Sequence, residues 1–346
     1  MCARATHDKF RGVGIFSKDR GGYTRDGYQS HQPMTNEPPV LVFGGTGILG
    51  APLAIQLAER GHRVHVAART KQFARPSPIH SVRCDVGVAG VAERLLRELH
   101  PAWVINCAAE TNIEACEENG PARRVNVDWP RELATAASST GVRCVHVSTD
   151  SVFSRKPGQD KPQEEDTRNP LNAYANQKAR AEDAVLDASN GEALVVRTNF
   201  FGWSPAPEHG LAAWTLSELR GGRRIRGFAD VFFNPLYTGD AVDLLIRLLK
   251  ANTTGLVHLL GAQCLSKLSF VRSLAEVFSL DPNLIEKGRL REAQFNVPRP
   301  LNTCLATTRL ERHIGQRPPT AAEGLRRMFR EENSLSARLA TLEEYL

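Results

Sequence analysis

The sequence predicts an α/β fold of the Rossmann type: a doubly wound parallel sheet with a smaller, mostly C-terminal α/β cap that binds a substrate. Three observations predict it. Short apolar runs alternate with helical patterns between residues 40 and 197, the first run leads into a glycine-rich turn, and the alternation loosens from residue 198. Strands that alternate with helices indicate βαβ units and a parallel sheet covered on both faces.

The expected elements follow one another in the order that such units require. Strands are predicted at residues 40–43, 64–68, 103–106, 142–148 and 193–197, with a further strand that ends near Cys84. Helices are predicted at 47–60, 88–99, 121–140, 170–188, 238–250 and 267–279, with an amphipathic tail at 320–345. We expect an N-terminal extension at 1–38, a dinucleotide-binding core at 39–197 to which 235–255 returns, a cap at 198–330 and a C-terminal helix at 331–346.

Composition excludes several classes of protein. Hydrophobic residues make up 41% of the chain, enough for a large core, and no apolar stretch approaches the roughly 18 residues of a membrane span. The net charge of +6 is small and aromatic residues make up 7%, so we expect no nucleic-acid partner. Seven cysteines lie far apart without a CxxC pair, which predicts no disulfide framework, a reducing, cytoplasmic setting and no zinc or other metal site.

The first 38 residues differ from the rest of the chain. They show no apolar period and lack the roughly 7–15-residue apolar core of a secretory signal, so we interpret them as a flexible extension. Met34 stands just before the first strand. We hypothesise that translation begins there, in which case a chain that starts at Met34 keeps its stability and activity.

The first strand runs directly into a glycine-rich turn at the opening of a helix. Its residues are Gly44, Gly45, Thr46, Gly47, Ile48, Leu49 and Gly50. Glycines allow the tight turn and let backbone N–H groups approach a pyrophosphate at the helix N-terminus. A glycine pattern in this context predicts a dinucleotide site.

The end of the second strand indicates which dinucleotide is bound. An acid usually stands there for the ribose hydroxyls of NAD, but this chain has Arg69, whose planar guanidinium can pair with a 2′-phosphate. NADPH is therefore favoured over NADH. The other cofactor contacts predicted are Asp85 and Val86 near the adenine and the small residues Cys107, Ala108 and Ala109 after a later strand.

A tyrosine and a lysine provide the predicted chemistry. Tyr174 and Lys178 lie four residues apart and share a helix face, and Asn169-Pro170 is the expected cap and first turn of that helix. An ammonium group near the phenol would lower its pKa and let it exchange a proton near neutral pH. About 25 residues upstream, Thr149 ends a strand at the edge where α/β proteins bind ligands.

These motifs together resemble the extended short-chain dehydrogenase/reductase family, and most closely its dTDP-4-dehydrorhamnose reductase branch of nucleotide-sugar reductases. The resemblance runs from about Val40 to Leu310. It rests on GGTGILG, INCAAETNIEACE, VNVDWPRELA, VSTDSVF, PLNAYANQKARAED, VVRTNFFG, FNPLYTGD and RPLNTCL.

The resemblance implies roles for single residues. Thr149 would hold the substrate keto oxygen, Tyr174 would be the general acid, and Lys178 would bind the nicotinamide ribose and tune the tyrosine. Asn126 would support the site. Substrate contacts would come from Thr111, Ser151, Asn199, Asn234 and Arg299.

Departures from the family pattern leave three functions open. Ser151 stands where dehydratases have a glutamate base, which disfavours dehydration, while Glu110, Ala175 and Gln177 also differ from the branch. The first function is NADPH-dependent reduction of a nucleotide-linked 4-keto-deoxysugar, with a homodimer as the candidate assembly. The second is sugar-nucleotide epimerisation. The third is a non-catalytic, NADP-binding role that resembles the regulatory subunit of methionine adenosyltransferase.

Overall fold

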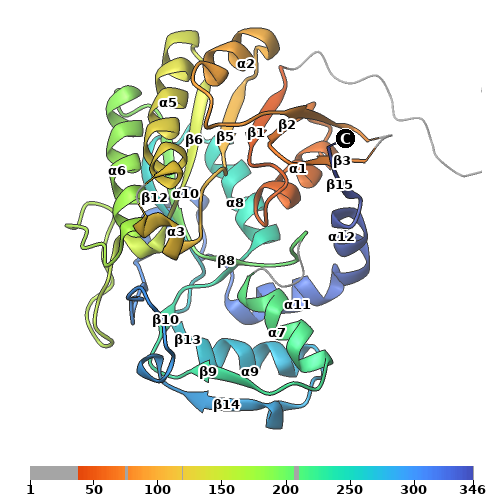
Figure 1. Ribbon diagram of the computed structural model, residues 1–346, viewed down its shortest axis with the longest axis vertical. Helices are drawn as coiled ribbons and strands as arrows, with labels where there is room; N and C mark the ends of the chain where they lie inside the picture. The colour runs from red at the N-terminus through yellow and green to blue at the C-terminus, as the bar shows by residue number, and fades with distance from the viewer. Residues whose placement is uncertain (1–37, 75–76, 119, 206–209, 346) are drawn as a thin grey trace, which may run out of the picture. The chain divides into compact units, whose positions relative to one another are not determined.

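A seven-stranded parallel sheet forms the centre of the computed structural model, which describes residues 38–74, 77–118, 120–205 and 210–345 (Figure 1). The predicted extension and Met34 lie outside these residues, apart from residue 38. The strands are arranged in the order β12-β7-β6-β5-β1-β2-β4, and every neighbouring pair is parallel. Their bounds are β1 (Val40–Phe43), β2 (Val64–Ala68), β4 (Ile79–Arg83), β5 (Trp103–Asn106), β6 (Arg143–Thr149), β7 (Leu194–Thr198) and β12 (Gly255–Leu259).

Helices cover both faces of this sheet because side chains of successive strand residues point to opposite faces. Val40 and Val42 pack in the core on one face, while Leu41 and Phe43 pack in the core on the other. The first face is covered by α1 (Gly50–Glu59) and α8 (Thr238–Lys250). The second is covered by α2 (Val91–Leu99), α5 (Trp129–Thr140) and α6 (Ala173–Ala188). The expected Rossmann-type α/β fold is confirmed.

The remaining helices and strands lie outside the seven-stranded sheet. The helices are α3 (Ile113–Glu117), α4 (Pro121–Arg123), α7 (Leu211–Arg220), α9 (Lys267–Val277), α10 (Thr308–Ile314), α11 (Ala321–Arg330) and α12 (Glu332–Leu339). The strands are β3 (Lys71–Phe73), β8 (Phe200–Phe201), β9 (Ile225–Phe228), β10 (Phe232–Phe233), β11 (Leu236–Tyr237), β13 (Leu265–Ser266), β14 (Ile285–Gly288) and β15 (Leu342–Glu344). The boundary between core and cap near residue 198 stays a prediction.

Three local expectations were wrong. The cap of α6 is Asn172, whose side chain accepts from the Ala175 N–H, because Asn169 instead bonds to both backbone groups of Ser154. The last helix ends at Leu339 and a strand follows it. A disulfide joins Cys264 to Cys304, although their separation of 40 residues carries no signal of pairing.

A buried carboxylate joins α6 to β6 and β7. Glu182 on α6 accepts from Nε and Nη2 of Arg197 on β7 at 3.0 and 2.8 Å, and both residues are at most 1% exposed. The Ser148 hydroxyl on β6 donates to the same carboxylate at 2.6 Å, and Arg168 Nη1 donates at 3.0 Å. Because a buried charge is stable only with partners, these bonds fix α6 against the end of β6.

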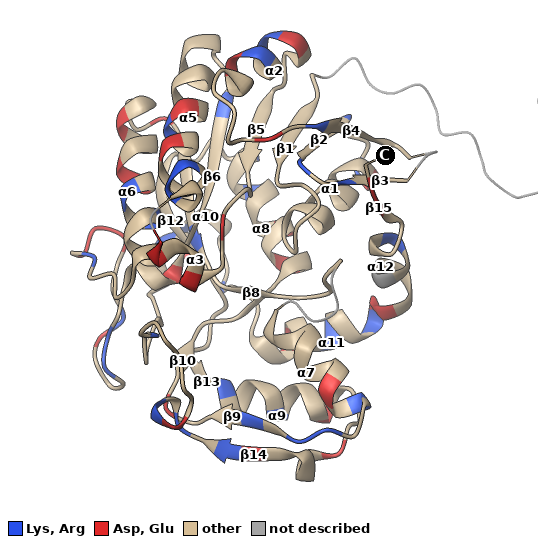
Figure 2. Cartoon of the chain, in the orientation of Figure 1, with Lys and Arg blue, Asp and Glu red and all other residues tan. Residues whose placement is uncertain are grey.

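Glu182→Ala should lower the free energy of unfolding by about 3–5 kcal/mol, because it leaves the buried Arg197 charge without its partner. The matched control is Glu98→Ala, which breaks an exposed pair with Arg94 and should cost under about 0.5 kcal/mol. Both residues belong to α2, a helix that carries acidic and basic residues (Figure 2). Urea unfolding measures the loss in both variants. Equal losses in the two variants would contradict the structural role of Glu182.

Candidate active site

The glycine turn lies where the strand order changes direction, between β1 and β5. Gly44 has φ +68°, and a Cβ there would stand 2.6 Å from the backbone nitrogen of Ala108 in the segment after β5. A Cβ on Gly50 would collide with the Gly44 carbonyl. The turn therefore has no room for a side chain at Gly44 or Gly50, and it leads into α1, whose first turn carries no acid. Backbone N–H groups in this arrangement fit the pyrophosphate of a dinucleotide.

The predicted adenosine contacts lie at the ends of neighbouring strands. Arg69 follows β2 and is exposed, and Asp85 follows β4, where its Oδ1 accepts from the Gly87 N–H at 2.8 Å. The Cys84 N–H donates to the Ala68 carbonyl at 2.9 Å, which aligns the two strand ends. Val86 packs against the core on the sheet face that α2, α5 and α6 cover. The side chains of Arg69 and Asp85 are therefore available to a cofactor at this edge of the sheet.

The predicted hydroxyl pair is brought together. Tyr174, in the first turn of α6, lies near Thr149 at the end of β6, and the side chains of the two residues interact. The expected lowering of the tyrosine pKa is wrong: burial raises the pKa of Tyr174, the nearby Asp150 raises it further, and the interaction with Thr149 opposes this only in part. The phenol is consequently protonated at neutral pH and is able to donate a proton.

Lys178 lies one helical turn after Tyr174 on α6 and is 2% exposed. Its Nζ donates to the Val147 carbonyl at 2.7 Å and stands 3.1 Å from Nε2 of His146. Burial lowers the pKa of Lys178 to about 8, although the nearby Glu182 carboxylate acts in the opposite direction. The sequence analysis missed His146, whose other ring nitrogen lies 3.1 Å from the Asn106 amide nitrogen.

Asn126 joins the segment after β5 to α6. It is fully buried in a π-helical turn at Arg124–Asp128, a kind of irregularity that is frequent at functional sites. Its amide accepts from the Glu110 N–H at 2.9 Å and donates to the Glu110 carbonyl at 3.0 Å and to the Gln177 side chain at 2.9 Å. Asn126 therefore holds together the two segments that carry predicted cofactor and catalytic residues.

Asp150 is a central residue that the sequence analysis did not select. Its buried carboxylate accepts from Thr303 Oγ1 at 2.6 Å and from Asn199 Nδ2 at 2.7 Å, and from the hydroxyls of Thr149 and Ser151 at 3.2 Å each. Burial raises the pKa of Asp150 against the effect of these bonds. The predicted substrate residues Asn199 and Ser151 are thus brought to the Thr149–Tyr174 pair.

One cation of the cap comes close to Asp150, and a second cation lies near the first. Lys267, at the start of α9, interacts electrostatically with both Asp150 and Arg299, and burial lowers its pKa. Arg299 pairs with Glu114 at 2.6 Å, and its Nη1 is buried without a hydrogen-bond partner among the described residues. No local sequence pattern marks Lys267, because only the folded cap brings it near these groups.

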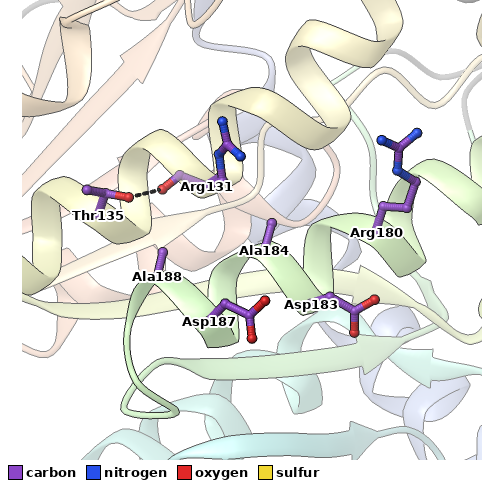
Figure 3. Close-up of a pocket in the computed structure, with 7 residues that line it drawn as sticks. All are labelled: Arg131, Thr135, Arg180, Asp183, Ala184, Asp187 and Ala188. Atoms are coloured by element: carbon purple, nitrogen blue, oxygen red, sulfur yellow. Dashed lines mark hydrogen bonds between the residues drawn. The ribbon is translucent and has the colours of Figure 1, made fainter.

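Other predicted residues lie differently. Asn234 is 1% exposed, and both ends of its amide bond to backbone, to the Gly261 carbonyl and the Leu305 N–H, which indicates a structural role. Thr111 is exposed after β5. A groove of about 560 Å³ on α5 and α6 contains none of the predicted site residues. It is lined by the side chains drawn in Figure 3: Arg131, Thr135, Arg180, Asp183, Ala184, Asp187 and Ala188.

The described part of the chain lacks two kinds of feature. No group of three or more His, Cys, Asp or Glu residues there could hold a metal ion. None of the helices there combines the length and the apolar character needed to cross a bilayer.

A family model described as the RmlD substrate binding domain matches residues 38–334, which is most of the chain. The chain belongs to this family. A dTDP-4-dehydrorhamnose reductase of Mycobacterium tuberculosis H37Rv is 32% identical over 75% of this chain and 82% of its own. A probable low-salt glycan biosynthesis reductase, Agl14, of Haloferax volcanii is 29% identical over 82% of this chain and 95% of its own.

A solved structure extends the comparison to the fold. The dTDP-4-dehydrorhamnose reductase of Bacillus anthracis, in complex with NADP, superposes with a TM-score of 0.73 and 22% identity, over 85% of this chain and 99% of that one. The resemblance to the nucleotide-sugar reductase branch of the extended short-chain dehydrogenase/reductases is confirmed.

The buried Lys178 should make stability depend on pH. Its pKa is about 8 in the folded chain, against the 10.5 of an ordinary exposed lysine, so between these values the unfolded chain holds a proton that the folded chain has lost. Stability should then rise with pH by about 3 kcal/mol across this range, and the destabilising contribution is fully present below pH 8. Urea unfolding of wild type and Lys178→Met isolates this contribution. If the difference in free energy of unfolding between the two proteins did not change with pH, this contribution of Lys178 would be contradicted.

Proposed function

We propose that the chain is an NADPH-dependent reductase that acts on the keto group of a nucleotide-linked 4-keto-deoxysugar. The observation that carries the proposal is the juxtaposition of the interacting Tyr174 and Thr149 side chains at the carboxyl edge of the sheet. The glycine turn at the start of α1 fits a dinucleotide, and relatives in the family are named as dTDP-sugar reductases. The family assignment makes the chain an NAD(P)-dependent oxidoreductase.

The catalytic residues act on the oxygen of the keto group. When bound, the reduced nicotinamide supplies a hydride to the carbonyl carbon, and negative charge grows on the oxygen. Tyr174 donates its phenolic proton to that oxygen, since its raised pKa keeps the proton on the phenol until the charge develops. The Thr149 hydroxyl holds the oxygen in line, and Lys178 binds the nicotinamide ribose.

The cofactor preference follows from charge at the end of β2. Arg69 is exposed there, Lys71 follows two residues later, and the chain has no acid in this turn. A guanidinium that is always charged suits a 2′-phosphate better than two ribose hydroxyls. We therefore propose NADPH over NADH.

The substrate's diphosphate binds near Lys267 and Arg299. These two cations repel each other, and the buried Nη1 of Arg299 has no hydrogen-bond partner among the described residues. A bound anion would offset the repulsion between the two cations, and its oxygens would accept a hydrogen bond from Nη1 of Arg299. A nucleotide-linked sugar brings such an anion next to its sugar ring.

Tyr174→Phe should lower kcat by about 10²- to 10⁴-fold, because the ring stays and the proton donor is lost. The test is NADPH oxidation with a panel of nucleotide-linked 4-keto sugars, together with NADPH binding, which should be unchanged. A variant with full turnover would overturn the proposed role. A wild type that recycles its cofactor would indicate an epimerase, and one that binds NADPH but reduces none of the panel would indicate the non-catalytic alternative.

Lys267→Ala and Arg299→Ala should each raise KM for the nucleotide-linked sugar about tenfold and change kcat little, because the diphosphate lies away from the reacting carbon. Arg291→Ala, at an exposed position in the cap, is the matched control and should leave KM unchanged. Steady-state kinetics at saturating NADPH measures all three. An unchanged KM in both cap variants would rule out this diphosphate site.

A further inference from the structure

The C-terminal end of the chain is paired with the turn that carries Arg69. Strand β15 runs antiparallel to β3, with Leu342 opposite Phe73 and Glu344 opposite Lys71 (Figure 1). Backbone bonds extend beyond both strands. The Ala74 N–H donates to the Thr341 carbonyl at 3.1 Å, and the Tyr345 N–H donates to the Thr70 carbonyl at 2.9 Å. The whole segment from residue 70 to 74 is therefore held by residues 341–345.

The Tyr345 side chain lies against the end of β4. Its ring centroid is 5.7 Å from the guanidinium carbon of Arg83, the last residue of β4. Its hydroxyl is buried and has no hydrogen-bond partner among the described residues. It also interacts electrostatically with Cys84, the residue after Arg83. Tyr345 thus contacts both strand ends that flank the proposed adenosine site, through its backbone and through its ring.

Helix α12 fixes this segment to the core. Leu335 and Leu339 are 7% and 2% exposed and pack in the same core as α1, and Arg338 pairs with Glu59 at the end of α1. The family model ends at residue 334. The segment that holds the Arg69 turn consequently lies outside the residues that the family model matches.

We propose that strand β15 and Tyr345 position the cations that bind the cofactor's 2′-phosphate, so that the C-terminal end of the chain sets the preference for NADP over NAD. This rests on the proposed cofactor site. Arg69 and Lys71 are attached to the turn that β15 holds, and Arg83 lies against the Tyr345 ring. When these cations are already held in place, less conformational entropy is lost as they bind the 2′-phosphate of NADP. NAD lacks this phosphate, so its affinity gains little. Tyr345 is a positioning residue that acts through these cations.

The test is calorimetric binding of NADP⁺ and NAD⁺ to the full chain and its variants. Tyr345→Ala and a chain that ends at Ala340 should each lower the NADP⁺ over NAD⁺ affinity ratio about tenfold, roughly the loss of one charge-assisted hydrogen bond. Arg69→Asp is the positive control. Phe329→Ala removes an exposed aromatic ring from α11, away from β3, and should keep the ratio. Equal weakening of both nucleotides, or no change, would overturn the proposal.

Hydrogen exchange of the wild-type chain tests the same inference if the variants do not fold. Saturating NADP⁺ should slow exchange of the Ala74 and Tyr345 amides more than saturating NAD⁺ does, and equal protection would overturn the proposal. A wild type that binds the two nucleotides equally would overturn the inference and the NADPH preference together. A wild type that prefers NADP⁺, with variants that keep this preference, would overturn the inference alone.

Discussion

The site depends on one buried carboxylate. Glu182 is a single helical turn beyond Lys178 and two beyond Tyr174, and it is bonded to Ser148, the neighbour of Thr149, and to Arg197 on the next strand. This fixes the rotation and height of α6 relative to β6. The Tyr174–Thr149 contact follows from it, because a helix that slid or turned by one residue would carry the phenol away from the strand end. A structural ion pair thereby sets the geometry of the proposed chemistry.

The cap is bound to the same region through segment 298–305. Asn172, the cap of α6, donates to the Pro298 carbonyl at 3.1 Å, and Thr303 donates to Asp150. The Cys264–Cys304 disulfide joins this segment to the stretch before α9, which carries Lys267. The residues proposed for proton transfer and those proposed for the diphosphate are therefore connected by short bonded paths, so that substrate binding in the cap and chemistry at the sheet edge occur on one framework.

Local sequence patterns predicted the features that interactions between residues near in sequence determine. The strands, the glycine turn and the Tyr174–Lys178 spacing follow from periodicity and turn chemistry, and the structure has them close to the expected bounds. The features that the sequence patterns missed depend on tertiary contacts. Asn169 and Asn172 are equally good caps in sequence, and only the bond of Asn169 to Ser154 separates them. Proximity to Lys178 suggested an acidic phenol, yet burial determines the pKa of Tyr174. The disulfide and β15 join residues too distant in sequence to leave a pattern.

The central claim is that this site transfers a hydride to a sugar carbonyl while Tyr174 supplies the proton. The most direct measurement is nuclear magnetic resonance of the sugar product formed with deuterated NADPH. The deuterium is placed at C4 of the nicotinamide, in the position from which the hydride is transferred. We predict one deuterium at the former keto carbon, in a single configuration, with one cofactor oxidised per sugar reduced. A sugar product without deuterium, or a labelled cofactor recovered intact beside an epimerised sugar, would contradict the account.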